Sequence, residues 1–280
     1  MNHYSGSADK REDADVTVQA LVLTGFGINC DKETARAFER AGAQAALVHL
    51  NDLILDPGML DRFHLMAIPG GFSFGDDIAS GKILANRLRY RLGPPIKQFI
   101  ADRKLIIGIC NGFQVMVKMG ILPLFDGEFV QEVTLTNNNS SRFENRWVTL
   151  AADPASRCVW TRGVDRLELP VRHGEGKFIP KDDAVLDRLR ANGQIVFRYC
   201  LPDGRPAQGQ FPENPNGAVD DIAGICDPSG RVFGLMPHPE AYWDRTNHPQ
   251  WTRRTLPEEG AGMQIFHNAL EYARQTFKVK

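Results

Sequence analysis

The feature that most constrains this chain is a cysteine at the end of an apolar run. Residues 105–109 read Leu-Ile-Ile-Gly-Ile, and Cys110 follows, with glycines two positions before it and two after it. An apolar run of this length predicts a buried strand of a parallel sheet. The Gly-x-Cys-x-Gly pattern predicts a sharp turn from that strand into a helix, because small flanking residues leave room for such a turn.

A helix that begins directly after Cys110 favours a reactive thiol. Its first backbone N–H groups would lie near the sulfur, where they stabilise a thiolate and offer a donor to an oxyanion. The competing interpretation is a structural cysteine, since free cysteine is among the most buried residue types. A reactive cysteine also needs a base, so the remainder of the chain decides between the two.

Short apolar runs alternate with helical patterns through the first half of the chain. This alternation predicts a three-layer α/β fold, with a mostly parallel central sheet and helices on both faces. Asp31 is the expected N-cap of the first helix. The predicted strands cover residues 18–24, 45–50, 64–69 and 104–109, and the predicted helices cover 31–41, 78–91, 94–102 and 112–119.

The second half has shorter, alternating runs, which predict antiparallel extensions of the same sheet. Asp227-Pro228-Ser229-Gly230 predicts a hairpin turn, because proline presets the turn and glycine allows a positive φ. With no internal repeat, one domain over 16–280 is expected after a flexible polar tail over 1–15. The predicted strands are 129–136, 146–151, 166–171, 194–200, 222–226 and 231–236, and a helix closes the chain over 260–276.

Composition excludes several classes of protein. A formal net charge of −1 provides no basic field for nucleic acid. The N-terminus has no apolar signal segment, and no apolar run reaches the ~18 residues that a membrane span requires. A cytoplasmic protein that binds neither nucleic acid nor membrane is therefore expected. The chain has an odd number of cysteines, widely spaced and with no C-x-x-C pair, which is typical of a reducing compartment. They are Cys30, Cys110, Cys158, Cys200 and Cys226.

His238 and Glu240 are the best candidates for a base and its orienting group. His238 follows an apolar run, and Pro239 favours an extended conformation for the residue before it. Residues two apart in an extended segment point to the same side, so the carboxylate can fix the imidazole tautomer, as in hydrolytic triads. Alone, the tripeptide also fits an exposed strand end. Together with Cys110 it predicts a catalytic triad.

Pro69-Gly70-Gly71 ends another predicted strand and exposes backbone N–H groups in a tight turn. The N–H groups of Gly71 and Asn111 are the expected oxyanion hole. The alternative is an ordinary strand-to-helix turn in which Asp76 or Asp77 caps the next helix.

Two other patterns carry no function. Gly25-Phe26-Gly27 follows a strand, but Cys30 occupies the third glycine position of a dinucleotide-binding motif. His173 and Glu175 lack a third ligand at useful spacing, so no metal site is expected.

At these segments the sequence resembles the triad-type (class I) glutamine amidotransferases, and among them the glutaminase subunits of phosphoribosylformylglycinamidine synthase. The resemblance runs from about Val18 to the C-terminal helix. The family usually has arginine where this chain has Ala241, and the segment 242–262 is an insertion. The stretches that carry the resemblance are Asn29-Cys30-Asp31, 70–76, 108–114, His173-Gly174-Glu175-Gly176-Lys177-Phe178, Asn214-Pro215-Asn216-Gly217 and 234–240.

The resemblance implies a flavodoxin-like fold and a defined reaction. Cys110 would attack the side-chain amide of glutamine, with His238 as base and Glu240 as its orienting group. Gln114, His173 and Glu175 would contact the substrate. No cofactor is expected in this chain. The partners implied are a large synthase subunit, which uses ATP and Mg²⁺ to convert formylglycinamide ribonucleotide to its amidine, and a small bridging subunit.

Three alternatives stay open at this point. They are an amidotransferase subunit that serves a different synthase, a cysteine hydrolase or chaperone of similar fold, and a catalytically silent assembly subunit. The aromatic and arginine-rich segment 242–262 fits either a partner interface or a loop folded back on its own domain.

Overall fold

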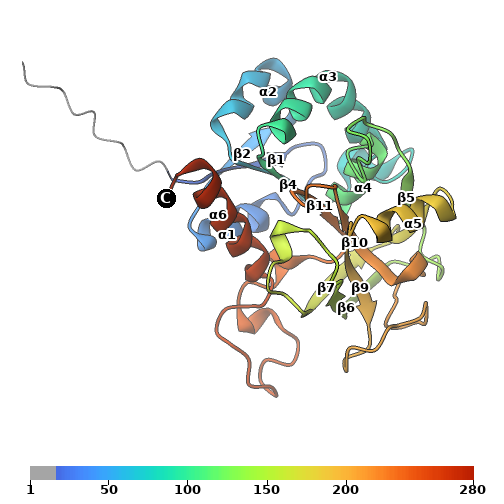
Figure 1. The fold of residues 1–280 in the computed structure, drawn as a ribbon. Helices are drawn as coiled ribbons and strands as arrows, with labels where there is room; N and C mark the ends of the chain where they lie inside the picture. Colours follow the sequence, from blue (N-terminus) through green and yellow to red (C-terminus); the bar gives the residue numbers. More distant parts are fainter. Residues whose placement is uncertain (1–16) are drawn as a thin grey trace, which may run out of the picture.

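The computed structural model describes residues 17–280, so the tail predicted over residues 1–15 lies outside the described residues. Within residues 17–280 the main sheet has nine strands in the order β2-β1-β3-β4-β11-β10-β9-β6-β7 (Figure 1). Its first five strands are mutually parallel. They are β2 (Gln44–His49), β1 (Gln19–Thr24), β3 (Leu65–Ile68), β4 (Leu105–Ile109) and β11 (Val232–Leu235).

The remaining four strands extend the sheet by antiparallel pairing, as predicted. They are β10 (Ile222–Cys226), β9 (Ile195–Cys200), β6 (Glu144–Ala152) and β7 (Arg166–His173). The strand predicted over 129–136 does not join this sheet. Only its second part forms a strand, β5 (Val133–Thr136), which pairs with β8 (Lys177–Pro180) in a separate two-stranded sheet.

Helices cover both faces of the parallel strands, which confirms the predicted three-layer α/β architecture (Figure 1). On one face lie α1 (Asp31–Ala41) and α6 (Met263–Phe277), where the rings of Phe38 and Phe266 meet edge to face at 5.0 Å. The other face carries α3 (Lys82–Ala101) and α4 (Asn111–Met119), which pack on each other. The strands β3 and β4 between these layers are buried at every residue.

The prediction of two helices over 78–91 and 94–102 is wrong. One helix, α3, begins at Lys82 and continues through Pro94 and Pro95. Proline removes the N–H bond to the carbonyl four residues earlier, here those of Tyr90 and Arg91. Both of these residues are exposed, so water can satisfy the freed carbonyl groups.

The prediction that Asp31 caps α1 is also wrong, because Asp31 is the first residue of the helix and Cys30 occupies the cap position. The Asp31 carboxylate instead accepts a hydrogen bond from Thr24 on β1. Two helices were not predicted, α2 (Leu50–Leu55) and α5 (Asp183–Ala191). The signal for α5 was present, since Asp182 accepts a hydrogen bond from the backbone of Val185 as a typical N-cap.

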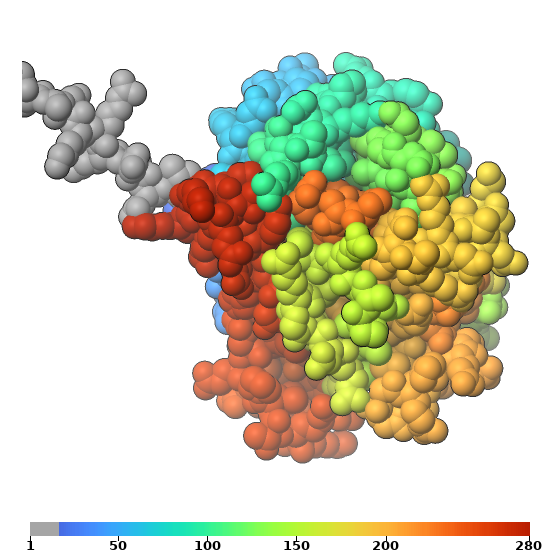
Figure 2. Space-filling model, in the orientation of Figure 1, coloured from blue at the N-terminus to red at the C-terminus, as the bar shows by residue number. Residues whose placement is uncertain are grey.

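The segment 242–262 folds back on its own chain and lies below α6 at the edge of the molecule (Figure 2). The Arg40 guanidinium of α1 lies 4.4 Å from the centre of the Trp243 ring. Tyr242 meets the Trp147 ring of β6 at 5.0 Å. Glu168 of β7 accepts a hydrogen bond from Arg254 at 2.7 Å.

Among residues 17–280, no helix combines the length and the apolar character needed to cross a membrane.

Candidate active site

Cys110 lies at the turn between β4 and α4, in a strained backbone conformation with φ 52° and ψ −106°. Its N–H donates to the Leu235 carbonyl of β11 at 2.8 Å. A Cβ atom at Gly112 would lie 1.7 Å from the Ile68 carbonyl oxygen, and one at Gly108 would lie 2.2 Å from the Met116 sulfur. Both flanking glycines are therefore required by close packing, and the turn has the form of a nucleophile elbow.

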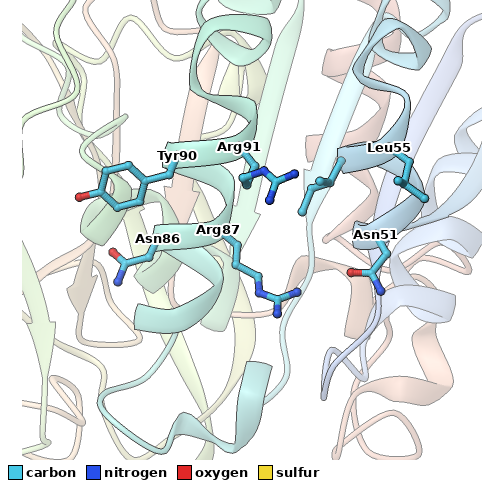
Figure 3. Close-up of a pocket in the computed structure, with 7 residues that line it drawn as sticks. Asn51, Leu55, Asn86, Arg87, Tyr90 and Arg91 are labelled. Atoms are coloured by element: carbon cyan, nitrogen blue, oxygen red, sulfur yellow. The ribbon is translucent and has the colours of Figure 1, made fainter.

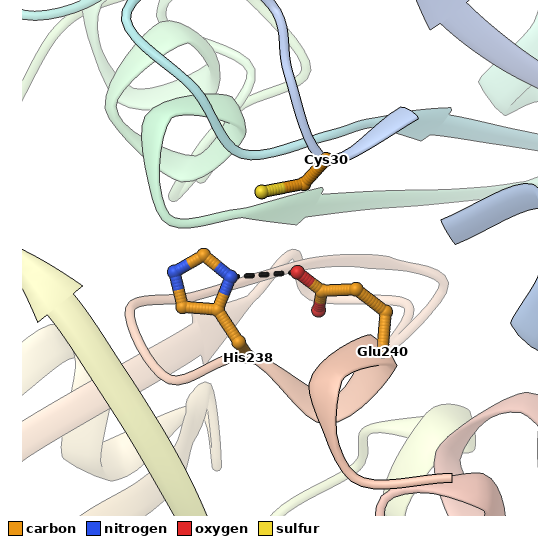
Figure 4. A group of neighbouring side chains, drawn as sticks. All are labelled: Cys30, His238 and Glu240. Carbon is orange, nitrogen blue, oxygen red and sulfur yellow. Dashed lines mark hydrogen bonds and ion pairs between the residues drawn. The ribbon is translucent and has the colours of Figure 1, made fainter. Parts of the chain in front are cut away.

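His238 and Glu240 form a buried pair at the end of β11, joined by a hydrogen bond of 2.6 Å between Nδ1 and Oε1 (Figure 4). Their side chains are 3% and 1% exposed. The backbone N–H of His238 donates to the Pro170 carbonyl at 2.9 Å, which fixes the segment after β11 against β7. Burial acts to lower the pKa of His238, but the Glu240 carboxylate and the Cys110 thiol raise that pKa well above its ordinary value.

Two thiols lie near the His238 imidazole, those of Cys110 and Cys30, and both raise the pKa of His238. Nε2 of His238 nevertheless has no hydrogen-bond partner in the described part of the chain. The Cys110 sulfur instead lies 3.6 Å from the Arg172 carbonyl oxygen. Such loose contacts are common before substrate binds, and they tighten when the reacting groups are drawn together.

Gly71 and Asn111, predicted to form the oxyanion hole, flank Cys110. Gly71 has φ +153°, and a Cβ atom there would lie 2.6 Å from the Gly27 carbonyl oxygen. Asn111 is the first residue of α4, so its N–H has no acceptor within the helix. Gly71 lines the same pocket as Cys110, and Asn111 follows Cys110 directly in the chain, so the oxyanion hole stays a prediction.

The Asn111 side chain joins the elbow to the loop after β3. Its Oδ1 accepts from the Ser73 N–H at 3.2 Å, and its Nδ2 donates to Asp76 Oδ1 at 3.3 Å. Asp76 does not cap α3, which begins at Lys82 after Gly81; it accepts instead from the Gly81 N–H at 3.2 Å. Sequence reasoning considered Asp76 only as a cap and missed this contact with the site.

Gln114 holds the 173–176 loop beside the elbow. Its Nε2 donates to the Glu175 carbonyl at 2.6 Å, and its Oε1 accepts from Asn111 Nδ2 at 2.9 Å. The Glu175 carboxylate lies 4.0 Å from the buried ammonium of Lys118. Lys118 in turn donates to the Ser80 carbonyl at 2.5 Å.

His173 presents a neutral imidazole with an unused acceptor. Asn138 Oδ1 accepts from the Gly176 N–H at 3.0 Å, which identifies this atom as the amide oxygen. The same oxygen lies 3.2 Å from His173 Nδ1, so the proton of the ring is on Nδ1. Burial and nearby His238 lower the pKa of His173 to about 3. Nε2 is buried without a partner among the described residues.

The described residues enclose a pocket of about 200 Å³ beside Cys110. Its lining includes Gly71, Phe72, Asp76, Ser80, Cys110, Gln114, Asn137, Phe143, Arg172, His173, Gly174 and Glu175.

A larger pocket of about 590 Å³ lies between α2 and α3 (Figure 3). Its lining contains no cysteine, histidine or carboxylate: Asn51, Ile54, Leu55, Asn86, Arg87, Tyr90 and Arg91. This pocket therefore lacks the groups for hydrolytic chemistry that line the smaller pocket at Cys110.

Comparison with known proteins identifies the family. The model of the CobB/CobQ-like glutamine amidotransferase domain matches residues 17–273. The phosphoribosylformylglycinamidine synthase subunit PurQ of Dehalococcoides mccartyi is 50% identical over 260 residues, which cover 92% of this chain and 98% of that protein. The chain belongs to the PurQ family of glutamine amidotransferases.

Two further relatives support this family assignment. The PurQ subunit of Methanococcus maripaludis is 42% identical over 268 residues, covering 92% of this chain and 98% of that protein. A chain in the structure of PurLQS from Thermotoga maritima superposes with a TM-score of 0.68 at 29% identity, covering 91% of this chain and 99% of that one.

Cys30 is the site residue that sequence reasoning left without a role. It belongs to the Asn29-Cys30-Asp31 stretch that carries the resemblance to the PurQ family, but the stretch itself assigns it no chemistry. Its position beside His238 depends on a contact between segments about 200 residues apart, which local patterns do not reveal. The structure therefore adds Cys30, Asp76 and Asn138 to the predicted site residues.

Proposed function

We propose that Cys110, His238 and Glu240 hydrolyse glutamine to glutamate and ammonia through a thioester at Cys110. The observation that carries this proposal is the strained cysteine at the strand–helix turn, placed beside a buried histidine–carboxylate pair. The fold alone would not be sufficient, since one fold hosts many functions. The chemistry follows from the positions of the three side chains.

In the first half-reaction the Cys110 thiolate attacks the carboxamide carbon of glutamine. The backbone N–H groups of Gly71 and Asn111 stabilise the oxyanion, and protonated His238 gives its proton to the leaving nitrogen, so that ammonia departs. In the second half-reaction His238 takes a proton from water, whose hydroxide attacks the thioester. Cys110 then leaves, and glutamate is released.

Glu240 acts on His238 rather than on the substrate. By accepting a hydrogen bond from the Nδ1–H group it keeps the ring proton on Nδ1 and the lone pair on Nε2, and it stabilises the imidazolium that forms. Asp76 and Glu175 supply negative charge to the pocket, which suits the α-ammonium group of glutamine. Nε2 of His173 supplies an acceptor for a substrate N–H, and Gln114 keeps the 173–176 loop in contact with the substrate.

Ammonia must then be passed on without release into water, where it would be mostly protonated at neutral pH. The solved relative from Thermotoga maritima is named PurLQS, a name that denotes an assembly and supports a complex with a large synthase subunit and a small bridging subunit. We assign ATP and Mg²⁺ to that large subunit, which would convert formylglycinamide ribonucleotide to its amidine. This chain, as a single amidotransferase domain over 16–280 in the cytoplasm, would provide the ammonia.

The test compares two nitrogen sources in the reconstituted complex. Cys110→Ala is expected to abolish amidine formation from glutamine and to preserve amidine formation from added ammonium salt, because only thioester formation needs the thiol. Undiminished glutamine-dependent activity in this variant would overturn the proposed nucleophile. If the wild-type chain hydrolyses glutamine but the complex yields no amidine, the ammonia would instead go to a different acceptor substrate.

A further inference from the structure

Cys30, His238 and Glu240 form a cluster of three potential metal ligands (Figure 4). One ligand atom from each residue, the thiol sulfur, an imidazole nitrogen and a carboxylate oxygen, lies within 4.8 Å of the other two. His238 and Glu240 are 2% and 1% exposed, whereas Cys30 is half-buried. An ion could therefore reach the cluster from the Cys30 side.

Figure 4 draws the Cys30 sulfur above the imidazole, on the side of the ring nitrogen that bonds Glu240, and Gly70 lies next to both groups. A Cβ atom built on Gly70 would lie 3.3 Å from that sulfur, 2.9 Å from Cε1 of His238 and 3.5 Å from Nδ1. Nδ1 is also the nitrogen that bonds Glu240. The three donors thus meet on the side of the ring that is not used for proton transfer with Cys110.

The cluster also contains an unused donor atom. The second carboxylate oxygen of Glu240, Oε2, is buried and has no hydrogen-bond partner among residues 17–280. A buried carboxylate oxygen without a partner is costly, and a cation would satisfy it. This observation is independent of the spacing of the three residues.

We propose that Cys30, His238 Nδ1 and Glu240 bind a zinc-class divalent cation, and that the bound cation switches off the glutaminase. A thiolate, an imidazole and a carboxylate are the ligand types of Zn²⁺, and three protein ligands leave the fourth tetrahedral position for water. The hydrogen bond between His238 and Glu240 opens to admit the ion. The inhibition rests on the proposed function, whereas the binding does not.

The inhibition follows from the position of one proton. In the active tautomer the ring proton is on Nδ1 and the Nε2 lone pair faces the nucleophile. A cation on Nδ1 uses the lone pair of that nitrogen, so the neutral ring carries its proton on Nε2. His238 then lacks the acceptor that Cys110 and water require. The Cys30 thiol loses its proton to solvent as the thiolate binds.

Cobalt absorption on the full-length chain tests the binding directly. Co²⁺ is added to the metal-free wild type, Cys30→Ser and Cys110→Ser, and thiolate-to-cobalt charge-transfer absorption is recorded. The band is expected in the wild type and in Cys110→Ser, and it is expected to be lost in Cys30→Ser. A wild type without the band, a band lost in Cys110→Ser, or a band kept in both variants would each overturn the proposal.

X-ray absorption of the Zn²⁺-loaded wild type keeps the proposal falsifiable should Cys30→Ser fail to fold. One sulfur ligand is expected, with nitrogen and oxygen completing the shell. Two sulfur ligands, or none, would overturn it.

Glutamine hydrolysis provides the functional arm, with each variant normalised to its own metal-free rate. Zn²⁺ is expected to inhibit the wild type at concentrations at least ~10-fold below those that inhibit Cys30→Ser, which is about 1.4 kcal/mol of binding free energy. Equal sensitivity would overturn the proposed switch. If the metal-free chain hydrolyses no glutamine even in the reconstituted complex, the proposed function fails and the cobalt result still decides the metal site.

Discussion

His238 and Glu240 share one buried hydrogen bond of 2.6 Å, and the effect of losing the carboxylate follows from it. Glutamine at position 240 can donate its amide N–H to Nδ1, which moves the ring proton to Nε2. Glu240→Gln is therefore expected to lower kcat on the order of 10³–10⁴-fold with a smaller change in KM. Steady-state glutaminase kinetics measure this. Glu258→Gln, on the exposed surface, is the control expected to match the wild type.

His173 predicts a dependence of stability on pH. Its pKa is about 3 in the folded chain and near the ordinary value of 6.5 in the unfolded chain. Between these values only the unfolded chain binds the proton, so the free energy of unfolding falls as the pH is lowered from about 6.5 toward about 3. Well inside this window the contribution of His173 is about 1.4 kcal/mol per pH unit.

Denaturant titrations of the wild type and His173→Gln across this window measure the effect. The variant is expected to lose stability less steeply on acidification, because it lacks the titrating imidazole. Identical slopes for the two proteins would show that His173 is not held neutral by the fold.

Among the structural elements, the turn from β4 into α4 tolerates no side chain at Gly112. The Cβ of Gly112→Ala would lie 1.7 Å from the Ile68 backbone carbonyl, which cannot rotate away. The variant is expected to lose at least about 2 kcal/mol of unfolding free energy, in the range of overpacked cores, together with glutaminase activity. Thermal and denaturant unfolding measure the first effect.

Gly93→Ala in α3 is the matched control for this change. A Cβ atom at Gly93 meets no other atom within 4 Å, and alanine favours a helix. Pro94 restricts an alanine placed before it, which opposes this helix preference, so the stability is expected to change by less than about 1 kcal/mol in either direction. Comparable losses in both variants would contradict the packing argument.

The elements also show how far a sequence determines this site. The apolar run before Cys110 and its flanking glycines specify the strand and the turn locally, so both could be predicted. Pro94 and Pro95 predicted a break in the helix, and this prediction was wrong. Whether a helix tolerates proline depends on the exposure of the preceding turn, which is a tertiary property that the sequence does not reveal. For β5, periodicity indicated a strand but could not indicate its partner.

At the scale of the whole molecule, the contacts that no local pattern reveals are those between distant segments. Cys30 beside His238 and Asp76 beside Asn111 arise because strands far apart in sequence end at the same edge of the sheet. The family motifs contained these residues, but their mutual positions required the assembled fold. The proposed triad residues gave a stronger signal in the sequence, because each chemical role needs a recognisable residue type.

The segment 242–262 contributes to global stability through Trp243. Its ring lies against Arg40 and Arg36 of α1, with ring-to-guanidinium distances of 4.4 and 5.2 Å. Trp243→Ala is expected to lower the free energy of unfolding by about 1–2 kcal/mol. Trp251→Ala, at a ring that is 45% exposed, is expected to change it by less than about 0.5 kcal/mol. Denaturant unfolding of both variants measures these changes. A larger loss of unfolding free energy in Trp251→Ala than in Trp243→Ala would contradict this account.

The measurement that tests the central claim most directly is the capture of the thioester. Wild-type chain is quenched in acid during turnover of glutamine, digested and analysed by peptide mass spectrometry. The account predicts a γ-glutamyl adduct on Cys110, which disappears on treatment with hydroxylamine and is absent from Cys110→Ala. An adduct on another cysteine, or glutamine turnover by Cys110→Ala at the wild-type rate, would contradict it.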